Sequence, residues 1–90
     1  MYRVFWLYSA QMELAEFWVD ADSSTRAELT AAAAQLDREL ERNPHLCGES
    51  RELNERILII DSLVAQYSVD DEHHEVTVLS VNVYKYRPKG

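Results

Sequence analysis

The chain has 90 residues, 47% of them hydrophobic, and a formal net charge of −7, which excludes a disordered chain and predicts one domain over residues 1–90. Cys47 is the only cysteine, so an internal disulfide is excluded and a reducing compartment is favoured. The longest aliphatic run, residues 57–60, is far too short to cross a membrane, and the first ten residues lack a signal peptide's cleavage site, so a cytoplasmic protein without membrane contact is expected.

The first predicted element is a strand over residues 2–8 (YRVFWLY), which are mostly β-branched or aromatic. Its apolar residues fall on both faces, which indicates a strand covered on two sides. Ser9 is expected to cap a helix that runs to about Val19. The buried stripe of that helix is predicted from the helical spacing of Ala10, Leu14, Phe17 and Trp18.

A second helix is predicted to begin at Thr25 and to end at about Arg42. Thr25 and Glu28 have the spacing of a capping box, in which each side chain bonds to a backbone N–H of the first turn. Pro44 disfavours helical geometry at the residue before it and so ends the helix. The predicted buried stripe consists of Leu29, Ala33, Leu36 and Leu40.

Three strands are predicted in the second half of the chain, over residues 56–60, 63–69 and 75–84. A tight turn at residues 61–62 and a longer one at residues 70–74 join them into an antiparallel meander. The first strand is expected to lie beside this meander. The predicted fold class is therefore α+β: a helical hairpin packed on a four-stranded, mainly antiparallel sheet, in the order β-α-α-β-β-β.

Candidate metal and cofactor sites are few. His73 and His74 are adjacent on a predicted hairpin and therefore point apart, whereas a metal site needs three or four converging ligands, so no metal is expected. His45 and Cys47 are an equally weak signal, because Cys47 has no local base at catalytic spacing. The chain has only two glycines, which excludes a glycine-rich phosphate loop, and no cofactor is expected.

The segment GESR, residues 48–51, links the second helix to the meander. Gly48 is expected to relieve the backbone where the chain turns from helix to sheet. A connector with local ion pairs is sufficient to explain the segment. The alternative is that it forms the edge of a functional surface.

Charge is divided unevenly along the chain. All 16 acidic residues and six of the nine basic residues lie within residues 1–75, which gives this part a net charge of −10. The last 15 residues contain three cations and no acid. We call residues 84–90 (YKYRPKG) the basic arm. In an extended conformation its tyrosines project to one side and its first two cations to the other, which suits a target-binding arm, although a solubilising strand end is the competing interpretation.

Six segments carry a further signal by their order and spacing. They are YRVFW (2–6), AQMELAEFW (10–18), LERNP (40–44), GESR (48–51), LVAQYSV (63–69) and VTVLSV (76–81). Together they resemble the RelE/ParE superfamily of toxins from type II toxin–antitoxin modules, and the resemblance covers nearly the whole chain. It implies a small toxin that a cognate antitoxin protein holds inactive. Apolar residues on both faces of the strands YRVFWLY and VTVLSVNVY also predict a small partner protein that covers this surface with a helix or a strand.

Within this superfamily the resemblance implies one of two targets, messenger RNA in the ribosome or DNA gyrase. Ribosome-dependent nucleases of the family carry an arginine where this chain has Leu63 and Val64, and lysines on the preceding strand, which here is the aliphatic run 57–60. A gyrase-type target is therefore preferred, and no catalytic residue is assigned. The alternative is a non-catalytic protein-interaction module of the same fold, which the net charge of −10 favours because negative charge opposes docking onto RNA.

The candidate target-binding residues are arginines, tyrosines and a lysine that can clamp a phosphate or stack on a ring. Two of the arginines have acidic neighbours, so ion pairing within the connector is the competing interpretation for them. The predicted set is Arg51, Arg56, Tyr84, Lys85, Tyr86 and Arg87.

Overall fold

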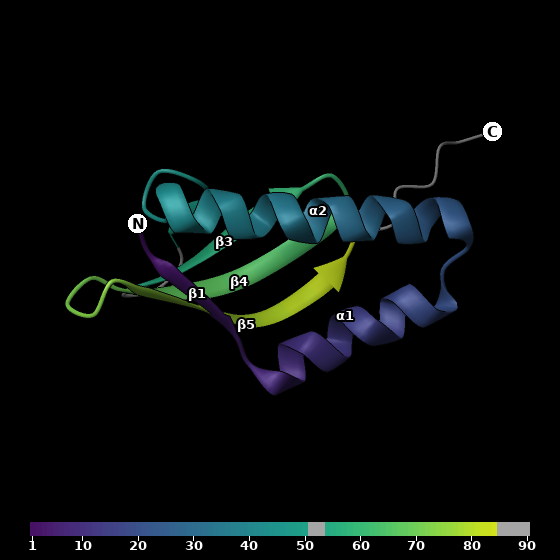
Figure 1. The fold of residues 1–90 in the computed structure, drawn as a ribbon, viewed down its shortest axis with the longest axis horizontal. Helices are drawn as coiled ribbons and strands as arrows, with labels where there is room; N and C mark the ends of the chain where they lie inside the picture. The colour runs from purple at the N-terminus through teal and green to yellow at the C-terminus, as the bar shows by residue number, and fades with distance from the viewer. Residues whose placement is uncertain (51–53, 85–90) are drawn as a thin grey trace.

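A computed structural model of the chain describes residues 1–50 and 54–84. Two helices cover one face of a five-stranded sheet, in which the strands lie in the order β1-β5-β4-β3-β2 (Figure 1). Neither helix in the described ranges is long and apolar enough to cross a membrane. The elements are β1 (Arg3–Trp6), α1 (Tyr8–Asp20), α2 (Ser23–Arg42), β2 (Glu49–Ser50), β3 (Glu55–Ile60), β4 (Leu63–Asp70) and β5 (Glu75–Val83).

The sheet is mixed, with its parallel pair at one edge. β1 runs parallel to β5, whereas the pairs β5–β4, β4–β3 and β3–β2 are antiparallel. The α+β class, the meander and the position of the first strand beside it are therefore confirmed. The predicted count of four strands is one too low, because Glu49 and Ser50 of the GESR segment pair with Ile57 and Arg56 as β2.

β1 is shorter than the predicted strand because the chain enters α1 at Tyr8. The N-cap of α1 is Leu7, which makes no side-chain capping bond, so the prediction that Ser9 caps this helix is wrong. The prediction that the first strand is covered on both faces is also wrong. Phe5 projects away from the helices and is 47% exposed.

α2 begins two residues before the predicted start because its N-cap is Asp22. The Asp22 carboxylate accepts a hydrogen bond from the backbone N–H of Thr25 at 2.8 Å. The capping-box hypothesis for Thr25 and Glu28 is therefore wrong, whereas the predicted end of the helix at Arg42 is confirmed.

The core lies between the two helices and the sheet, and α2 supplies more of it than α1. Leu29, Leu36 and Leu40 of the predicted α2 stripe are at most 1% exposed, but Ala32 takes the buried position predicted for Ala33. On α1 the only buried residue is Ala10. The rest of the predicted α1 stripe, Leu14, Phe17 and Trp18, therefore remains partly accessible.

A β-bulge lets both halves of β5 contribute to the core. The pairing with β4 shifts by one residue, which leaves Leu79 as the extra residue. Without that shift Val81 would point to the opposite face from Val76 and Val78, whereas all three are buried. The N–H of Val81 lies on the part of β5 that β1 does not reach, and it donates to Glu13 Oε1 of α1 at 3.0 Å.

Candidate functional site

In the part of the chain that the structure describes, no helix covers the second face of the sheet, which we call the outer face. The strand register places Phe5, Ile57, Ile59 and Val64 on it. Ile59 is 61% exposed and Phe5 is 47% exposed. Ile57, Ile59 and Val64 belong to the neighbouring strands β3 and β4, whereas Phe5 lies at the edge of the sheet on β1. Accessible apolar side chains on neighbouring strands are typical of a surface that binds another molecule.

Carboxylates dominate the charge of the outer face. The strand register adds Glu49, Glu55 and Asp70 to this face. Glu75 is also there and forms an ion pair with Arg3, with 2.7 Å between Oε2 and Nη2. Arg3 is the only cation that the described strands place on this face. The outer face therefore combines an apolar patch on β3 and β4 with polar side chains and a net negative charge.

Arg56, from the predicted target-binding set, lies on the other side of β3 and faces the helices. It pairs with the buried Tyr67 across the sheet. Its Nη2 donates to the backbone oxygen of Gly48 at 3.0 Å, and its Nε is buried with no hydrogen-bond partner among the described residues. The guanidinium is thus directed into the loop that precedes β2.

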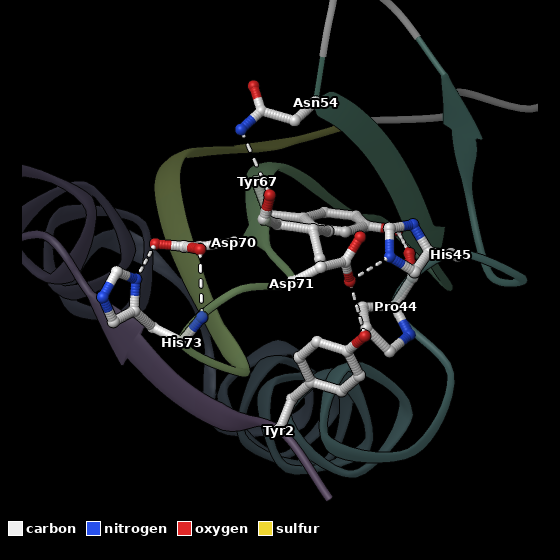
Figure 2. A network of polar contacts seen from close by, with 9 residues as sticks. Tyr2, Pro44, His45, Asn54, Tyr67, Asp70, Asp71 and His73 are labelled. Carbon is white, nitrogen blue, oxygen red and sulfur yellow. Dashed lines mark hydrogen bonds and ion pairs between the residues drawn. The ribbon is translucent and has the colours of Figure 1, made fainter.

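Tyr67, on β4, also holds this loop in place through its hydroxyl group. Its hydroxyl lies 2.7 Å from the carbonyl oxygen of Pro44 (Figure 2). It also lies 2.6 Å from the carbonyl oxygen of Cys47. Burial and then the neighbouring Cys47 raise the pKa of Tyr67 well above its ordinary value, so the hydroxyl stays protonated and donates. Gly48 has a φ of 77°, which confirms its predicted role in the turn from helix to sheet.

A separate set of polar contacts, Tyr2, His45 and Asp71, connects three distant segments, and we call it the N-terminal clasp (Figure 2). Asp71, in the turn between β4 and β5, accepts a hydrogen bond from the Tyr2 hydroxyl at 2.6 Å. His45 Nε2 lies 2.6 Å from the same carboxylate oxygen. Hydrogen bonding to His45 first, and to Tyr2 next, holds the pKa of Asp71 below its ordinary range.

The adjacent histidines of the same turn contact different partners. His73 Nδ1 lies 2.9 Å from Asp70 Oδ2, a bond that holds the pKa of Asp70 below its ordinary range. The ring of His74 packs edge-on against Tyr2, with 5.2 Å between the ring centroids. In the described ranges, no three His, Cys, Asp or Glu side chains come together in a way that could hold a metal.

Acid is expected to weaken the N-terminal clasp. The folded pKa of Asp71 lies below the unfolded value of about 4, so the unfolded chain takes up a proton first as the pH falls, and stability is lost below about pH 4. We expect Asp71→Asn to flatten the fall in melting temperature between about pH 5 and pH 3. The exposed neighbour Glu72→Gln should keep the wild-type profile, and a wild-type profile in Asp71→Asn would contradict this prediction.

An apolar groove of about 430 Å³ lies between the two helices and β1. Trp6 Nε1 donates to Asp37 Oδ1 at 2.9 Å, which fixes the indole in the groove wall. Much of the α1 stripe that was predicted to be core faces this space. The groove is lined by Trp6, Gln11, Leu14, Ala15, Trp18, Val19, Ala33 and Asp37.

The corner between the helices holds one end of the groove in place. Arg26 Nε donates to the carbonyl oxygen of Trp18 at 2.8 Å, and its Nη2 donates to that of Val19 at 2.9 Å. The guanidinium carbon also lies 4.4 Å from the centre of the Trp18 ring. Trp18 and Val19 are therefore exposed but held in a fixed position.

The described part of the chain does not bring the predicted target-binding residues together. Arg56 pairs with Tyr67 near the middle of β4, whereas the N–H of Tyr84 donates to the carbonyl oxygen of Ser62, just before the start of β4, at 2.7 Å. Tyr84 is 63% exposed. The remaining predicted residues, Arg51, Lys85, Tyr86 and Arg87, lie outside the described ranges.

The sequence interpretation missed the groove because it assigned Leu14 and Trp18 to the core. One signal was available in the sequence. Phe17, Trp18 and Val19 are consecutive, and neighbouring helical positions point about 100° apart, so the three cannot all face one core.

Models of known protein families give no match to the chain, and no curated protein matches it. Solved structures are similar to it. A chain of the RelBE2 toxin–antitoxin complex from Mycobacterium tuberculosis has a TM-score of 0.74 at 21% identity and covers 91% of this chain and 90% of its own length. A chain of the ParDE system from P. aeruginosa has a TM-score of 0.71 at 15% identity, and the match covers 94% of this chain and 98% of that one. The isolated E. coli RelE toxin has a TM-score of 0.63 at 20% identity, and the match covers 97% of this chain and 88% of that one.

These likenesses confirm the predicted resemblance at the level of the fold, since the chain has the fold of the RelE and ParE toxins. RelE and ParE proteins share this fold with the chain over most of their length. The fold alone assigns no function to this chain, so a proposal must rest on the side chains that it presents.

Proposed function

We propose that this chain is the toxin of a type II toxin–antitoxin pair and that it docks onto a protein target of the gyrase type instead of cutting ribosome-bound messenger RNA. The observation that carries this choice is the charge of the outer face, where the only described cation, Arg3, is already paired with Glu75. Binding to RNA gains its affinity from cations that replace counterions on phosphates. An apolar surface with carboxylates around it suits a protein partner of complementary, basic charge.

The chemistry available on the outer face supports an inhibitor more than a nuclease. Cleavage at a ribose 2′-hydroxyl needs a base, an acid and cations that stabilise the charged phosphorane. At the centre of the outer face, β3 and β4 present Ile57, Ile59 and Val64. These side chains can be buried against a protein but cannot transfer a proton. The carboxylates on the same face could act as a base, but the described strands add no unpaired cation to this face that would stabilise the phosphorane.

We also propose that a cognate antitoxin places an amphipathic helix in the groove between α1 and α2. The similar chains of RelBE2 and ParDE come from toxin–antitoxin systems. The groove supplies apolar walls, and Asp37 lies at its edge while Glu16 and Asp20 lie on the adjoining surface of α1. The partner helix is therefore expected to carry small or aliphatic residues on one face and lysine or arginine beside them.

An arginine at position 15 should block binding of the antitoxin helix in the groove. Ala15 is exposed and lines the groove, so Ala15→Arg adds bulk and a positive charge where a basic helix would pack. We expect co-purification with the antitoxin to fall at least about tenfold, as about 1.4 kcal/mol of lost binding would produce, while the melting temperature of the free chain stays unchanged. Ala31→Arg, on an exposed position of α2 outside the groove, is the matched control and should bind normally.

The proposed function is tested by controlled expression in a bacterial host. We expect growth to stop, gyrase-dependent breaks in DNA to accumulate and messenger RNA to remain uncut, and co-expression of a small protein encoded beside the gene should restore growth. Cut messenger RNA in ribosomes would overturn the target. Unchanged growth with folded protein present would instead favour the non-catalytic interaction module.

A charge placed on the outer face should separate toxicity from folding. Ile59 is 61% exposed, so Ile59→Lys leaves the core intact but puts a cation in the centre of the proposed docking surface. We expect growth inhibition to be lost with little change in melting temperature. Leu46→Lys, at a residue that is 83% exposed and lies off the sheet, should remain toxic, and equal toxicity of the two variants would argue against the outer face.

The basic arm is proposed as a second contact with the target. Tyr84 is exposed at the end of β5, and Lys85, Tyr86 and Arg87 follow it. In the same growth assay, Lys85→Ala combined with Arg87→Ala should abolish inhibition and leave the melting temperature nearly unchanged. A double variant that stays fully toxic would remove the arm from the mechanism and return attention to Arg51 at the GESR segment.

A further inference from the structure

A second pocket, of about 340 Å³, opens where the connector between the helices meets the end of β5. Phe17 and Leu29 give it apolar walls, and Val83 brings the last residue of β5 to its edge. Asp20 and Asp22 are exposed and line the same pocket. The space is thus part apolar and part acidic, and it adjoins the point where the basic arm begins.

The two carboxylates are available to a cation. Within the described ranges no ion pair joins Asp20 or Asp22 to a basic side chain. Arg26 is near Asp22, but its guanidinium donates to the carbonyl oxygens of Trp18 and Val19. Asp22 accepts the backbone N–H of Thr25, and this bond lowers its pKa, so the carboxylate stays charged at neutral pH.

We infer that this pocket binds the chain's own C-terminal segment, residues 85–90, with Lys85 and Arg87 paired to Asp20 and Asp22. Val83 pairs with the buried Leu63 and therefore points to the helix side of the sheet. Continuing the two-residue period of an extended chain places positions 85 and 87 on that same side. Each residue adds about 3.3 Å, so both cations lie within reach of a pocket that Val83 itself lines.

The ligand class is a short, extended, basic peptide, and the segment carries three cations and no acid. Exposed ion pairs are individually weak, so the docked and free arms interconvert and added salt favours the free arm. In the docked arm the cations meet the body and Tyr86 faces the other side. A target that uses the same cations must then compete with Asp20 and Asp22. The binding itself does not depend on the proposed toxin function.

Paramagnetic NMR on the full chain tests this inference. A nitroxide label on Gly90→Cys, in a Cys47→Ser background, keeps all three cations of the segment. At low salt we expect selective broadening of the backbone amides of Phe17, Asp20 and Thr25, and its loss at about 0.5 M NaCl, where the Debye length falls to roughly 4 Å.

A pair of charge variants supplies the control. Asp20→Asn with Asp22→Ser removes both carboxylates, and serine preserves an N-cap acceptor for α2, so the selective broadening should disappear while the fold remains. Glu41→Gln with Glu72→Gln removes the same charge and should leave the broadening unchanged. Uniform broadening, broadening centred on outer-face residues such as Thr77, or broadening that survives the aspartate changes would each overturn the inference. Because the readout is spectroscopic, any of these results leaves the growth assay for the toxin function to be decided separately.

Discussion

Alanine at position 48 is expected to destabilise the protein severely. Gly48 has a φ of 77°, and a left-handed backbone costs a residue with a side chain about 1–2 kcal/mol. In addition, a Cβ there would lie 2.4 Å from the carbonyl oxygen of Ile57 and 3.0 Å from the Tyr67 hydroxyl. Since both neighbours belong to central strands, the loop must move away, and the bonds from Tyr67 and Arg56 to this loop would be lost with it.

Chemical denaturation of Gly48→Ala and two companions measures this effect. Gly48→Asn tolerates the backbone conformation better than alanine but keeps the Cβ, so it should also be destabilised if the contact with Ile57 dominates. Ser50→Ala lies two residues away in β2, is exposed and already has a Cβ, so it should unfold as the wild type does. Equal midpoints for Gly48→Ala and Ser50→Ala would contradict the proposed close contact.

Shortening Leu36 to alanine is expected to cost about 2–5 kcal/mol, because the deleted atoms leave a cavity in a packed core. Leu36 is 1% exposed in the middle of the buried stripe of α2 and belongs to the cluster between this helix and the sheet. A small domain is stable by only about 5–15 kcal/mol, so this single change removes a large share of its stability.

Leu46→Ala is the matched control for Leu36→Ala, because it deletes the same atoms from a side chain that is 83% exposed. We expect its unfolding free energy to differ from that of the wild type by less than about 0.5 kcal/mol. If both leucine variants lost the same stability, α2 would have to be rotated relative to the sheet.

The sequence alone determined the α+β class and most element boundaries in the second half of the chain. The predicted strands 56–60, 63–69 and 75–84 agree within a residue with β3, β4 and β5, because alternating apolar residues and polar turns are local signals. The end of α2 at Arg42 followed from the proline two residues later. In the same way, the spacing of Leu29, Leu36 and Leu40 identified three members of its buried stripe.

The sequence also identified the right fold, but only part of the candidate site. Of its target-binding residues, the described ranges include Arg56 and Tyr84, and only Tyr84 is exposed. Alternation tells which residues of a strand share a face, but not which of the two faces the helices cover. Arg56 lies on the face that the helices cover and Ile57 lies on the outer face, which is the reverse of what their side chains would suggest.

The tertiary structure decided the features that depend on contacts between distant segments. The parallel pairing of β1 with β5, the short strand β2 and the bulge at Leu79 all arise from partners that lie far away in the sequence or from a shift in register between strands. The groove beside Trp6 exists because Ala10 is the only residue of α1 that becomes buried, so Leu14 and Trp18 remain accessible and line it. Local periodicity fixes which side chains can be buried, and only the packing of the elements determines which of them are buried and which remain available for a partner.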